Sequence, residues 1–391
     1  MRVVMVSHLF PRAEEDVAGA SIWRLAEAIA RRGHEVTVVA PSDRGDVGES
    51  KLGEVSVRRV RYARAARETL AYRGSVRPFR DPFTAVSYGS LIWTMARATG
   101  DAVKQVHAQV IHAHFALPSG LAVRLAARAG RPYVVTLHEG EETQMRRVPG
   151  GRRLTAWVLE GAGTLTAVTS AIAAQGAELI GAPRERFTVT PMPIALGLTA
   201  HPDSARSGAI FVGRLERASR VDRMLDALAE VKRRGRLIDV TIVGDGAERA
   251  ALKARAISLG LNADFSGYLD PGELSRRMRD KRLLILPAVD DEAGTVVAEA
   301  LTHGVPIVAA RGGAMSDLFL DPDAGLLLSE TDISSFADAI RAVAEGDRFT
   351  VGAQRAGRVL VERRSPEKLA QQWEAIYTKA RAAGTRASVA G

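Results

Sequence analysis

Residues 283–309 read LLILPAVDDEAGTVVAEALTHGVPIVA. Two apolar runs, Leu283–Leu286 and Pro306–Ala309, flank an acidic loop and a stretch of helical composition, Thr295–His303. Near-continuous apolar runs are typical of parallel strands that are covered on both faces. The stretch therefore predicts a right-handed strand–helix–strand unit, the building block of a doubly wound parallel sheet.

The same alternation of short apolar runs and helical stretches extends over the whole chain. The predicted strands are Val3–Ser7, Glu35–Ala40, Val110–Ala113, Tyr133–Leu137, Thr164–Val168, Ala209–Val212, Val240–Val243, Leu283–Leu286 and Pro306–Ala309, with a weaker one at Val55–Val60. The predicted helices include Ala20–Arg32, Leu117–Ala129, Val221–Arg234, Ala247–Leu259 and Thr295–His303. This pattern predicts an α/β protein with Rossmann-like, doubly wound parallel sheets.

The rhythm breaks once, between residues 195 and 207, where Pro, Gly, Ser and Asp concentrate. We expect one Rossmann-like domain over residues 1–195 and a second over residues 208–365. Ligands of open parallel sheets bind beyond the carboxyl ends of the strands. Two such domains joined by a linker are expected to face each other across a cleft.

Composition excludes several classes of protein. The 391 residues include no cysteine, so disulfide frameworks, thiolate nucleophiles and Cys-ligated metal centres are excluded. No apolar run approaches the ~18 residues of a membrane-spanning helix. The apolar start, Met1–Ser7, is too short for a signal peptide, so we expect a cytoplasmic protein.

The positive charge is concentrated in one segment. The chain carries a net charge of +9, and residues 58–80 hold eight arginines against one acid, Glu68. Arg73, Arg77 and Arg80 share helical spacing. Such a segment suits an anionic partner, and peripheral contact with the anionic inner membrane surface through Arg58–Arg80 is one interpretation. A solvated arginine face or a pocket for a phosphorylated soluble acceptor are the alternatives.

Several predicted strands end in residues that suit an anionic ligand. Gly19 precedes a helix, whose free N–H groups and dipole favour an anion, although a turn glycine fits equally well. Arg214 follows the strand Ala209–Val212, where a guanidinium suits a diphosphate. After the strand Leu283–Leu286, unpaired N–H groups of Gly294, Thr295 and Val296 could receive phosphate or sugar hydroxyls. Glu299, more than one turn into that helix, could accept hydrogen bonds from a ribose.

Three histidines follow or end strands in the first half. A lone histidine such as His138 is usually structural. His112 and His114 share a strand face and could form a metal pair, but no third ligand is evident. We therefore expect a structural role for this pair, no metal site and no cofactor.

The motifs, taken together, resemble those of the retaining glycosyltransferases of family 4, the glycosyl transferases group 1, which have the GT-B fold. In the second half they are Phe211-Val-Gly-Arg-Leu, Val221-Asp222, Ile242-Val-Gly-Asp-Gly-Ala-Glu-Arg, Phe265-Ser-Gly-Tyr, Leu286-Pro, Asp291-x7-Glu299-Ala, Gly304-Val-Pro-Ile-Val-Ala and Gly312-Gly313. In the first half they are Gly19, Arg32-Gly-His-Glu-Val, Val110-Ile-His-Ala-His and Val135-Thr-Leu-His138.

The resemblance implies an enzyme that moves a sugar, a hexose or a related one, from a nucleotide-diphosphate-sugar donor to an acceptor hydroxyl without a metal. His138, Arg214 and Asp291 would be the catalytic residues, with His138 beside the transferred sugar. The donor would contact Gly19, Arg214, Ser219, Arg220, Gly267, Tyr268, Asp291, Glu292, Ala293, Gly294, Thr295, Val296 and Glu299. The final helix, Pro366–Arg381, would pack back onto the first domain.

Three positions depart from the family pattern. Ser219 stands where the family usually has a lysine, with Arg220 and Arg217 beside it. Asp291 replaces a glutamate and has Glu292 next to it, and Pro191-Met-Pro replaces Pro-Asn-Gly. A nucleotide-sugar epimerase or phosphorylase of the same fold, or a catalytically impaired nucleotide-sugar-binding homologue, are therefore the alternatives. Nucleic acid is not an expected partner, because aromatic residues make up only 5% of the chain.

Overall fold

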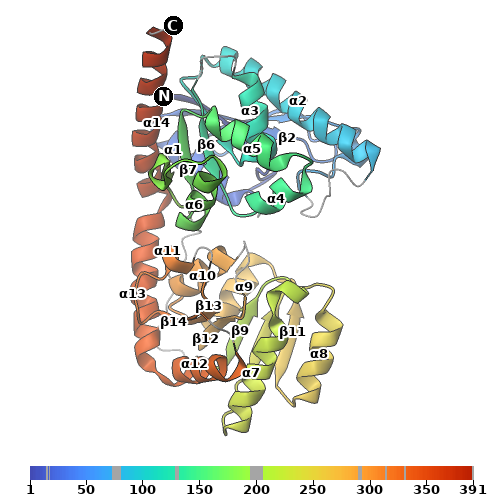
Figure 1. The fold of residues 1–391 in the computed structure, drawn as a ribbon, viewed down its shortest axis with the longest axis vertical. Helices are drawn as coiled ribbons and strands as arrows, with labels where there is room; N and C mark the ends of the chain where they lie inside the picture. The colour runs from blue at the N-terminus through green and yellow to red at the C-terminus, as the bar shows by residue number, and fades with distance from the viewer. Residues whose placement is uncertain are drawn as a thin grey trace. The chain divides into compact units, whose positions relative to one another are not determined.

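A computed structural model describes residues 1–14, 16, 18–72, 81–127, 132–193, 206–288, 293–312, 315–329 and 332–389. The chain divides into two compact units (Figure 1): unit 1 is Met1–Pro193 with Arg364–Gly391, and unit 2 is Ile194–Arg363. Each unit is a parallel or nearly parallel sheet with helices, which confirms the predicted α/β class. Most of the predicted linker, residues 195–205, lies outside the described residues.

Unit 1 contains an eight-stranded sheet in the order β3-β4-β2-β1-β5-β6-β7-β8. Its strands are β1 (Arg2–Val6), β2 (Glu35–Pro41), β3 (Gly48–Leu52), β4 (Val55–Val60), β5 (Val110–His114), β6 (Val134–Leu137), β7 (Thr164–Ala167) and β8 (Phe187–Val189). All neighbours pair in parallel except β3 and β4.

Alternate residues of a strand point to opposite faces of the sheet. Because both sets of side chains are apolar here, both faces of the sheet are covered by helices. On β1, Val4 and Val6 pack into one hydrophobic cluster, and Val3 and Met5 into the other. The helices of unit 1 are α1 (Ala20–Arg31), α2 (Pro82–Gln105), α3 (Leu121–Ala126), α4 (Glu141–Arg147), α5 (Gly151–Glu160), α6 (Ser170–Leu179) and α14 (Pro366–Val389).

The last helix, α14, belongs to unit 1 although it follows unit 2 in the chain. It packs on α1 and β5, and Figure 1 shows it as the long red helix beside α1. Its Leu369, Ala370, Trp373 and Tyr377 are fully buried in the same cluster as Val3 and Met5. Burial of a large aromatic side chain stabilises by roughly 2–3 kcal/mol, so this face of the sheet depends on α14.

Two helices differ from the sequence prediction. Within the described part of the predicted helix Leu117–Ala129, which ends at residue 127, only α3 is helical, because Ala116–Gly120 form a separate turn in which Leu117 has extended dihedral angles. The 24-residue α2 was not predicted, although Asp81 caps it by accepting a hydrogen bond from Thr84 N and Pro82 occupies its first turn. An Asp–Pro pair of this kind is a helix-start signal.

Unit 2 contains a six-stranded parallel sheet in the order β11-β10-β9-β12-β13-β14. Its strands are β9 (Ala209–Val212), β10 (Val240–Val243), β11 (Ala263–Gly267), β12 (Leu283–Leu286), β13 (Ile307–Ala310) and β14 (Gly325–Leu328). Its helices are α7 (Val221–Arg233), α8 (Arg249–Ser258), α9 (Pro271–Arg279), α10 (Ala293–Thr302), α11 (Met315–Leu318), α12 (Ile333–Glu345) and α13 (Asp347–Arg364).

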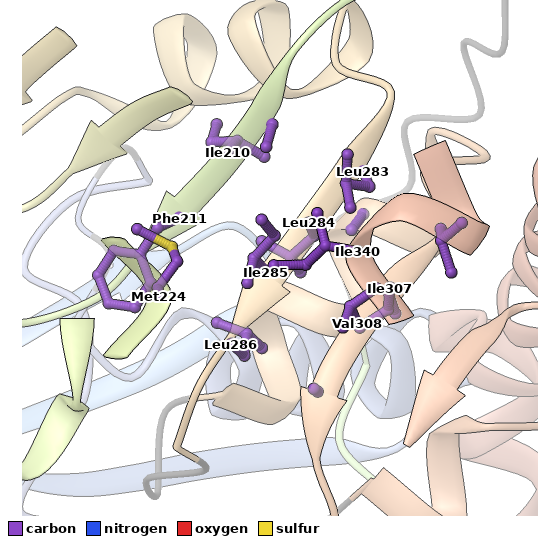
Figure 2. Packing of buried hydrophobic residues seen from close by; sticks show 14 of the residues in the cluster. Ile210, Phe211, Met224, Leu283, Leu284, Ile285, Leu286, Ile307, Val308 and Ile340 are labelled. Atoms are coloured by element: carbon purple, nitrogen blue, oxygen red, sulfur yellow. The ribbon is translucent and has the colours of Figure 1, made fainter. Parts of the chain in front are cut away.

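The core of unit 2 is formed by branched side chains from neighbouring strands. Figure 2 shows Ile210 of β9, Leu284 of β12 and Val308 of β13 in the same buried cluster as Ile340 of α12, which lies beside Leu284. These side chains are fully buried. The strands consequently present their carboxyl ends as a fixed edge, from which the following loops emerge.

Strand order reverses once in each sheet. In unit 1 the reversal falls between β1 and β5, and in unit 2 between β9 and β12. The loops after such a pair leave toward opposite faces and open a crevice at the carboxyl ends of the strands, where open α/β sheets bind ligands. We therefore expect ligand-binding residues at two edges: the carboxyl ends of β1 and β5 in unit 1, and those of β9 and β12 in unit 2.

Candidate functional site

In unit 2 the loops after β9 and β10 are packed backbone to backbone. Gly213 N donates to Val243 O (3.1 Å), and Leu215 N donates to Asp245 O (2.9 Å). Gly244 has φ +126°, and a Cβ at this position would lie 2.0 Å from the carbonyl oxygen of Gly213. Only glycine permits this contact. The backbone on both sides of Arg214 is thus held firmly at the edge of the sheet.

The Arg214 side chain extends from this rigid backbone into solvent. It is 57% exposed and forms a long ion pair with Glu216 (3.4 Å). Exposed ion pairs of this length contribute little free energy, so the guanidinium is available to an anion. Ser219 is buried, whereas Arg220 has a left-handed backbone (φ 53°) at the start of α7.

Helix α10 starts one strand away, after β12. The N–H groups of its first turn, which include those of Gly294, Thr295 and Val296, have no partner within the helix. Glu299 lies one turn further, and burial raises the pKa of its carboxyl. Asp291 and Glu292 lie outside the described residues, and of Ala293 only the backbone is described.

Gly267 ends β11, on the other side of β10, and Tyr268 follows it. Gly244 N donates to Gly267 O (2.8 Å), which ties this loop to the glycine turn beside Arg214. Gly267 has φ +71°, and the Tyr268 side chain is 79% exposed. The structure therefore brings Arg214, Gly267 and the α10 start to three strand ends of one sheet edge.

In unit 1, Gly19 stands at the start of α1 with φ +76°. A Cβ at this position would lie 2.4 Å from the carbonyl oxygen of Leu9 and 2.9 Å from Cα of Phe10. The loop after β1 thus folds directly against the helix start, and only glycine fits between them.

Histidines gather at the carboxyl ends of β1, β5 and β6. His8, His114 and His138 are almost completely buried. His114 Nδ1 and His138 Nε2 are 3.0 Å apart, and His8 Nδ1 lies 3.2 Å from Ser119 Oγ. Burial lowers the pKa of His8 to about 4 and holds the pKa values of His114 and His138 well below 6.5, so all three are neutral at physiological pH.

Phe115 separates two of these rings. It stacks on His138 (4.3 Å between ring centroids) and meets the edge of His8 (4.6 Å). Its backbone has φ +70°, which is an outlier for a bulky residue. Strain of this kind concentrates at functional sites. No sequence signal marked Phe115 or His8.

Glu141, at the start of α4, links the loops after β5 and β6. Its Oε1 accepts hydrogen bonds from Ala116 N (3.0 Å) and His138 N (3.4 Å). Burial raises the pKa of this carboxyl to about 8, and its Oε2 atom is buried without a hydrogen-bond partner among the described residues. Sequence reasoning missed Glu141, because its partners are backbone groups brought to it by the fold.

His112 and His114 share a face of β5, as their alternation predicts, and both ring nitrogens of His112 have hydrogen-bond partners. His112 Nε2 lies 2.7 Å from Thr136 Oγ1, and His112 Nδ1 lies 2.8 Å from the hydroxyl of Tyr377 on α14. Across the part of the chain that the structure describes, no three His, Asp or Glu side chains are placed to hold a metal ion.

The arginines of residues 58–72 do not form a single solvated patch. Arg59 is buried: it donates to Pro11 O and Tyr72 Oη, and it pairs with Asp46. Arg58 is engaged by Glu49 and Gln105. Arg61, Arg64 and Arg67 are exposed, and Arg67 lies over the ring of Phe83 (4.7 Å). Arg73, Arg77 and Arg80 lie outside the described residues.

None of the helices in the described ranges combines the length and the apolar character that crossing a bilayer requires.

Two relatives among solved structures share the fold of nearly the whole chain. Sucrose-phosphate synthase from Thermosynechococcus elongatus is 18% identical, with a TM-score of 0.76 over 98% of this chain and 99% of the other. Anabaena HepE, solved in complex with UDP and glucose, is 16% identical, with a TM-score of 0.66 over 97% and 99% of the two chains. Both support the two-unit GT-B architecture.

Sequence comparison agrees along the chain. Glycogen synthase from Mycobacterium tuberculosis is 24% identical over 97% of this chain and 93% of its own length. The family model for glycosyltransferase family 4 matches residues 18–197, and the model for glycosyl transferases group 1 matches residues 203–359. With one model on each side of the linker and the GT-B fold in both units, the chain belongs to the family 4, or group 1, glycosyltransferases.

Proposed function

We propose that this enzyme transfers a sugar from a nucleotide-diphosphate-sugar donor to an acceptor hydroxyl, with retention of configuration and without a metal ion or other cofactor. The observation that carries the proposal is the arrangement at the β9 and β12 strand ends. An exposed guanidinium on a rigid glycine turn lies there one strand away from the start of helix α10, whose first N–H groups have no partner within the helix. The combination suits a diphosphate.

Unit 2 is proposed to bind the nucleoside diphosphate. Arg214 neutralises charge that develops on the diphosphate as the glycosidic bond breaks, and the first turn of α10 donates N–H groups to it. Arg220 supplies the second cation, in place of the lysine that the family usually has at Ser219. Glu299 accepts hydrogen bonds from the ribose, and Gly267 and Tyr268 lie beside the base. Asp291 or Glu292 contacts the donor sugar.

Unit 1 is proposed to contact the donor sugar and to approach the diphosphate. Gly19 permits close approach to the diphosphate, and His138 lies beside the transferred sugar. Glu141 Oε1 is already held by two backbone N–H groups, so this carboxyl is proposed to order the loops and not to act as a nucleophile. This favours a same-face mechanism, in which a leaving phosphate oxygen takes the proton of the acceptor hydroxyl as the new glycosidic bond forms.

The test combines binding and turnover. Calorimetry with a panel of nucleoside diphosphates should reveal one preferred base, and Arg214→Ala should lower turnover by about 100-fold or more, as loss of one preorganised donor does. Arg233→Ala is the matched control, because Arg233 is also an exposed, ion-paired arginine of unit 2. Near-normal turnover in Arg214→Ala would contradict the proposed function.

The product assay separates the remaining alternatives. A transferase releases nucleoside diphosphate only when acceptor is present. An epimerase converts the donor without acceptor, a phosphorylase needs inorganic phosphate, and an impaired homologue binds nucleotide without any turnover.

We also propose that unit 1 contacts an anionic membrane surface peripherally. Phe83, Val86 and Trp93 are exposed, and their spacing of three and seven residues places them on one face of α2. Arg61, Arg64 and Arg67 are exposed, and Arg67 lies over the ring of Phe83 at the start of this helix. Aromatic side chains beside basic ones are suited to a lipid–water interface.

Liposome sedimentation tests this contact. Binding to anionic vesicles at low salt, weaker at high salt, is expected. Trp93→Ser should reduce it, as should serine at Arg73, Arg77 and Arg80 together, whereas Trp157→Ser, another exposed tryptophan of unit 1, should not. No binding to either vesicle type would favour a phosphorylated soluble acceptor instead.

A further inference from the structure

The row His112, His114 and His138 determines where the proton of the candidate catalytic imidazole lies. His138 Nε2 and His114 Nδ1 are 3.0 Å apart, so one of these two nitrogens carries the proton that joins them. His114 Nε2 is buried and has no hydrogen-bond partner among the described residues. These two facts distinguish the possible tautomers.

If His138 Nε2 donated, His114 would have to carry its own proton on Nε2. That would create a buried N–H group without an acceptor, which is among the rarest defects of folded proteins. If His114 Nδ1 donates, the buried His114 Nε2 is merely an unused lone pair. A charged ring would avoid the choice, but full burial disfavours imidazolium here. The second arrangement is therefore the stable one.

His112 restrains the His114 ring from the other side. Thr166 Oγ1 donates to Val135 O (3.2 Å), and the Thr136 and Thr166 hydroxyls are 2.6 Å apart. Thr136 must therefore donate to Thr166 and accept from His112 Nε2–H. His112 Nδ1 is then an acceptor for the Tyr377 hydroxyl, 2.8 Å away.

This ordered chain leaves His112 no proton to share with His114. The two rings lie 4.1 Å apart between centroids, and His112 in turn packs on Trp373 of α14 at 4.5 Å. The His112 ring therefore restricts the position of the His114 ring but forms no hydrogen bond with His114 Nε2. The orphaned nitrogen is thus a consequence of the arrangement around His114.

We propose that His114 is a positioning residue that fixes His138 in the neutral tautomer with its proton on Nδ1. His138 Nε2 is then occupied as the acceptor from His114. His138 Nδ1 is not among the fully buried unpartnered atoms and has no bond to a described residue, so it is the edge of the ring open to a ligand. His138 is thereby a hydrogen-bond donor through Nδ1–H and is not available as a base through Nε2. Its role toward the donor sugar rests on the proposed function.

The tautomers can be read directly in the full-length protein without substrate. Long-range ¹H–¹⁵N correlation spectra of ¹⁵N-histidine-labelled protein distinguish protonated from bare ring nitrogens, and the eight histidines can be assigned by single substitutions. We expect Nδ1–H on His114 and on His138, and Nε2–H on His112. A proton on His138 Nε2 would overturn the proposal.

Kinetics of two variants test the consequence. Asparagine places an amide donor where Nδ1 of histidine stands, so His114→Asn should keep the His138 tautomer and remain within about twofold of the wild-type kcat. His114→Leu cannot donate, and loss of one directed hydrogen bond should lower kcat about tenfold while KM changes less. Equal losses in the two variants would contradict a positioning role.

The two proposals fail differently. If the wild-type protein binds no nucleoside diphosphate in calorimetry, the proposed function is wrong, but the spectra still decide the His114–His138 arrangement. If nucleotide binds and turnover occurs but His138 carries its proton on Nε2, only the positioning role of His114 is wrong.

Discussion

The candidate edges of the two units differ in charge and in exposure. In unit 1 the edge is built from buried, neutral imidazoles and a buried carboxyl whose pKa is raised. In unit 2 it is built from glycine turns, a helix start and the exposed guanidinium of Arg214. A solvated cation keeps its charge for an anionic ligand, whereas buried neutral groups act through directed hydrogen bonds that water cannot weaken. The comparison predicts that substitutions in unit 1 act through geometry and those in unit 2 through charge.

Two glycines with the same backbone conformation offer the sharpest contrast. Gly19 in unit 1 has φ +76° and no room for a Cβ, whereas Gly267 in unit 2 has φ +71° and its nearest neighbour at 3.7 Å, the Arg249 guanidinium. Gly267→Ala should cost about 1 kcal/mol for the left-handed backbone. Gly19→Ala should cost about 3 kcal/mol, because the Leu9 backbone must also shift.

Urea unfolding can resolve the effect on unit 1. All four tryptophans, Trp23, Trp93, Trp157 and Trp373, lie in unit 1, so their fluorescence reports that unit alone. Because unit 2 has no tryptophan, the loss of stability caused by Gly267→Ala is measured by amide hydrogen exchange of β11. Equal destabilisation by the two substitutions would show that the close approach at Gly19 does not matter.

The buried carboxyl of Glu141 makes the stability of unit 1 depend on pH. The pKa of Glu141 is raised to about 8 in the fold from an ordinary value of 4.5. Between these values the folded protein binds more protons than the unfolded chain, so the Glu141 contribution to stability falls as pH rises. Glu141→Gln stays neutral and can still accept from Ala116 N and His138 N.

The stability of Glu141→Gln relative to wild type should therefore rise from pH 5 to pH 9, by a few kcal/mol at about 1.4 kcal/mol for each pKa unit. Tryptophan fluorescence in urea at several pH values measures this difference. Glu142→Gln, an exposed neighbour on α4, is the matched control and should give a constant difference. A flat difference for Glu141→Gln would mean that the carboxyl ionises freely in the fold.

A smaller effect is expected from a charge-conserving change in unit 2. Arg214→Lys keeps the cation but loses the planar fork that can bind two phosphate oxygens. We expect about tenfold weaker binding of the preferred nucleoside diphosphate, against a much larger loss in turnover for Arg214→Ala. Calorimetry of the two variants side by side measures it. Affinity unchanged from wild type would indicate that charge alone is recognised.

The smallest effect is expected at Tyr377. Tyr377→Phe removes the donor to His112 Nδ1 and leaves a buried acceptor unpaired, at a cost of about 1 kcal/mol. Tryptophan fluorescence in urea should register this loss. Trp373 packs against Tyr377, so its emission also reports whether α14 stays docked. A loss several times larger would mean that α14 itself detaches.

How far the sequence predicted the site depended on the type of contact. The positions of Arg214 and the α10 start were predicted because the end of an apolar run marks the end of a strand. The residues that follow a strand end lie at the edge of the sheet. Strand periodicity also placed His112 and His114 on one face. Their true partners were not predictable, because the pairing of β5 with β6 brings Thr136 and His138 beside them from 24 residues away.

In the basic segment, the sequence did not predict which arginines are exposed. A count of arginines predicts one patch, but burial depends on the fold: Arg59 is enclosed by Pro11, Tyr72 and Asp46, which come from three separate loops. Phe115 gives no signal in the sequence because its left-handed backbone is imposed by neighbours. Composition and periodicity can be read from the sequence, but the contacts between distant loops that bury a residue cannot.

The return of α14 to unit 1 has a consequence for synthesis on the ribosome. All residues of unit 2 are translated before Trp373 and Tyr377, whose side chains fill one face of the unit 1 sheet. Unit 2 can therefore finish folding while the nascent chain is still attached, although domains generally complete in order from the amino terminus. The first residues to emerge belong to the unit that is completed last, and until then its apolar face is the natural target for a chaperone.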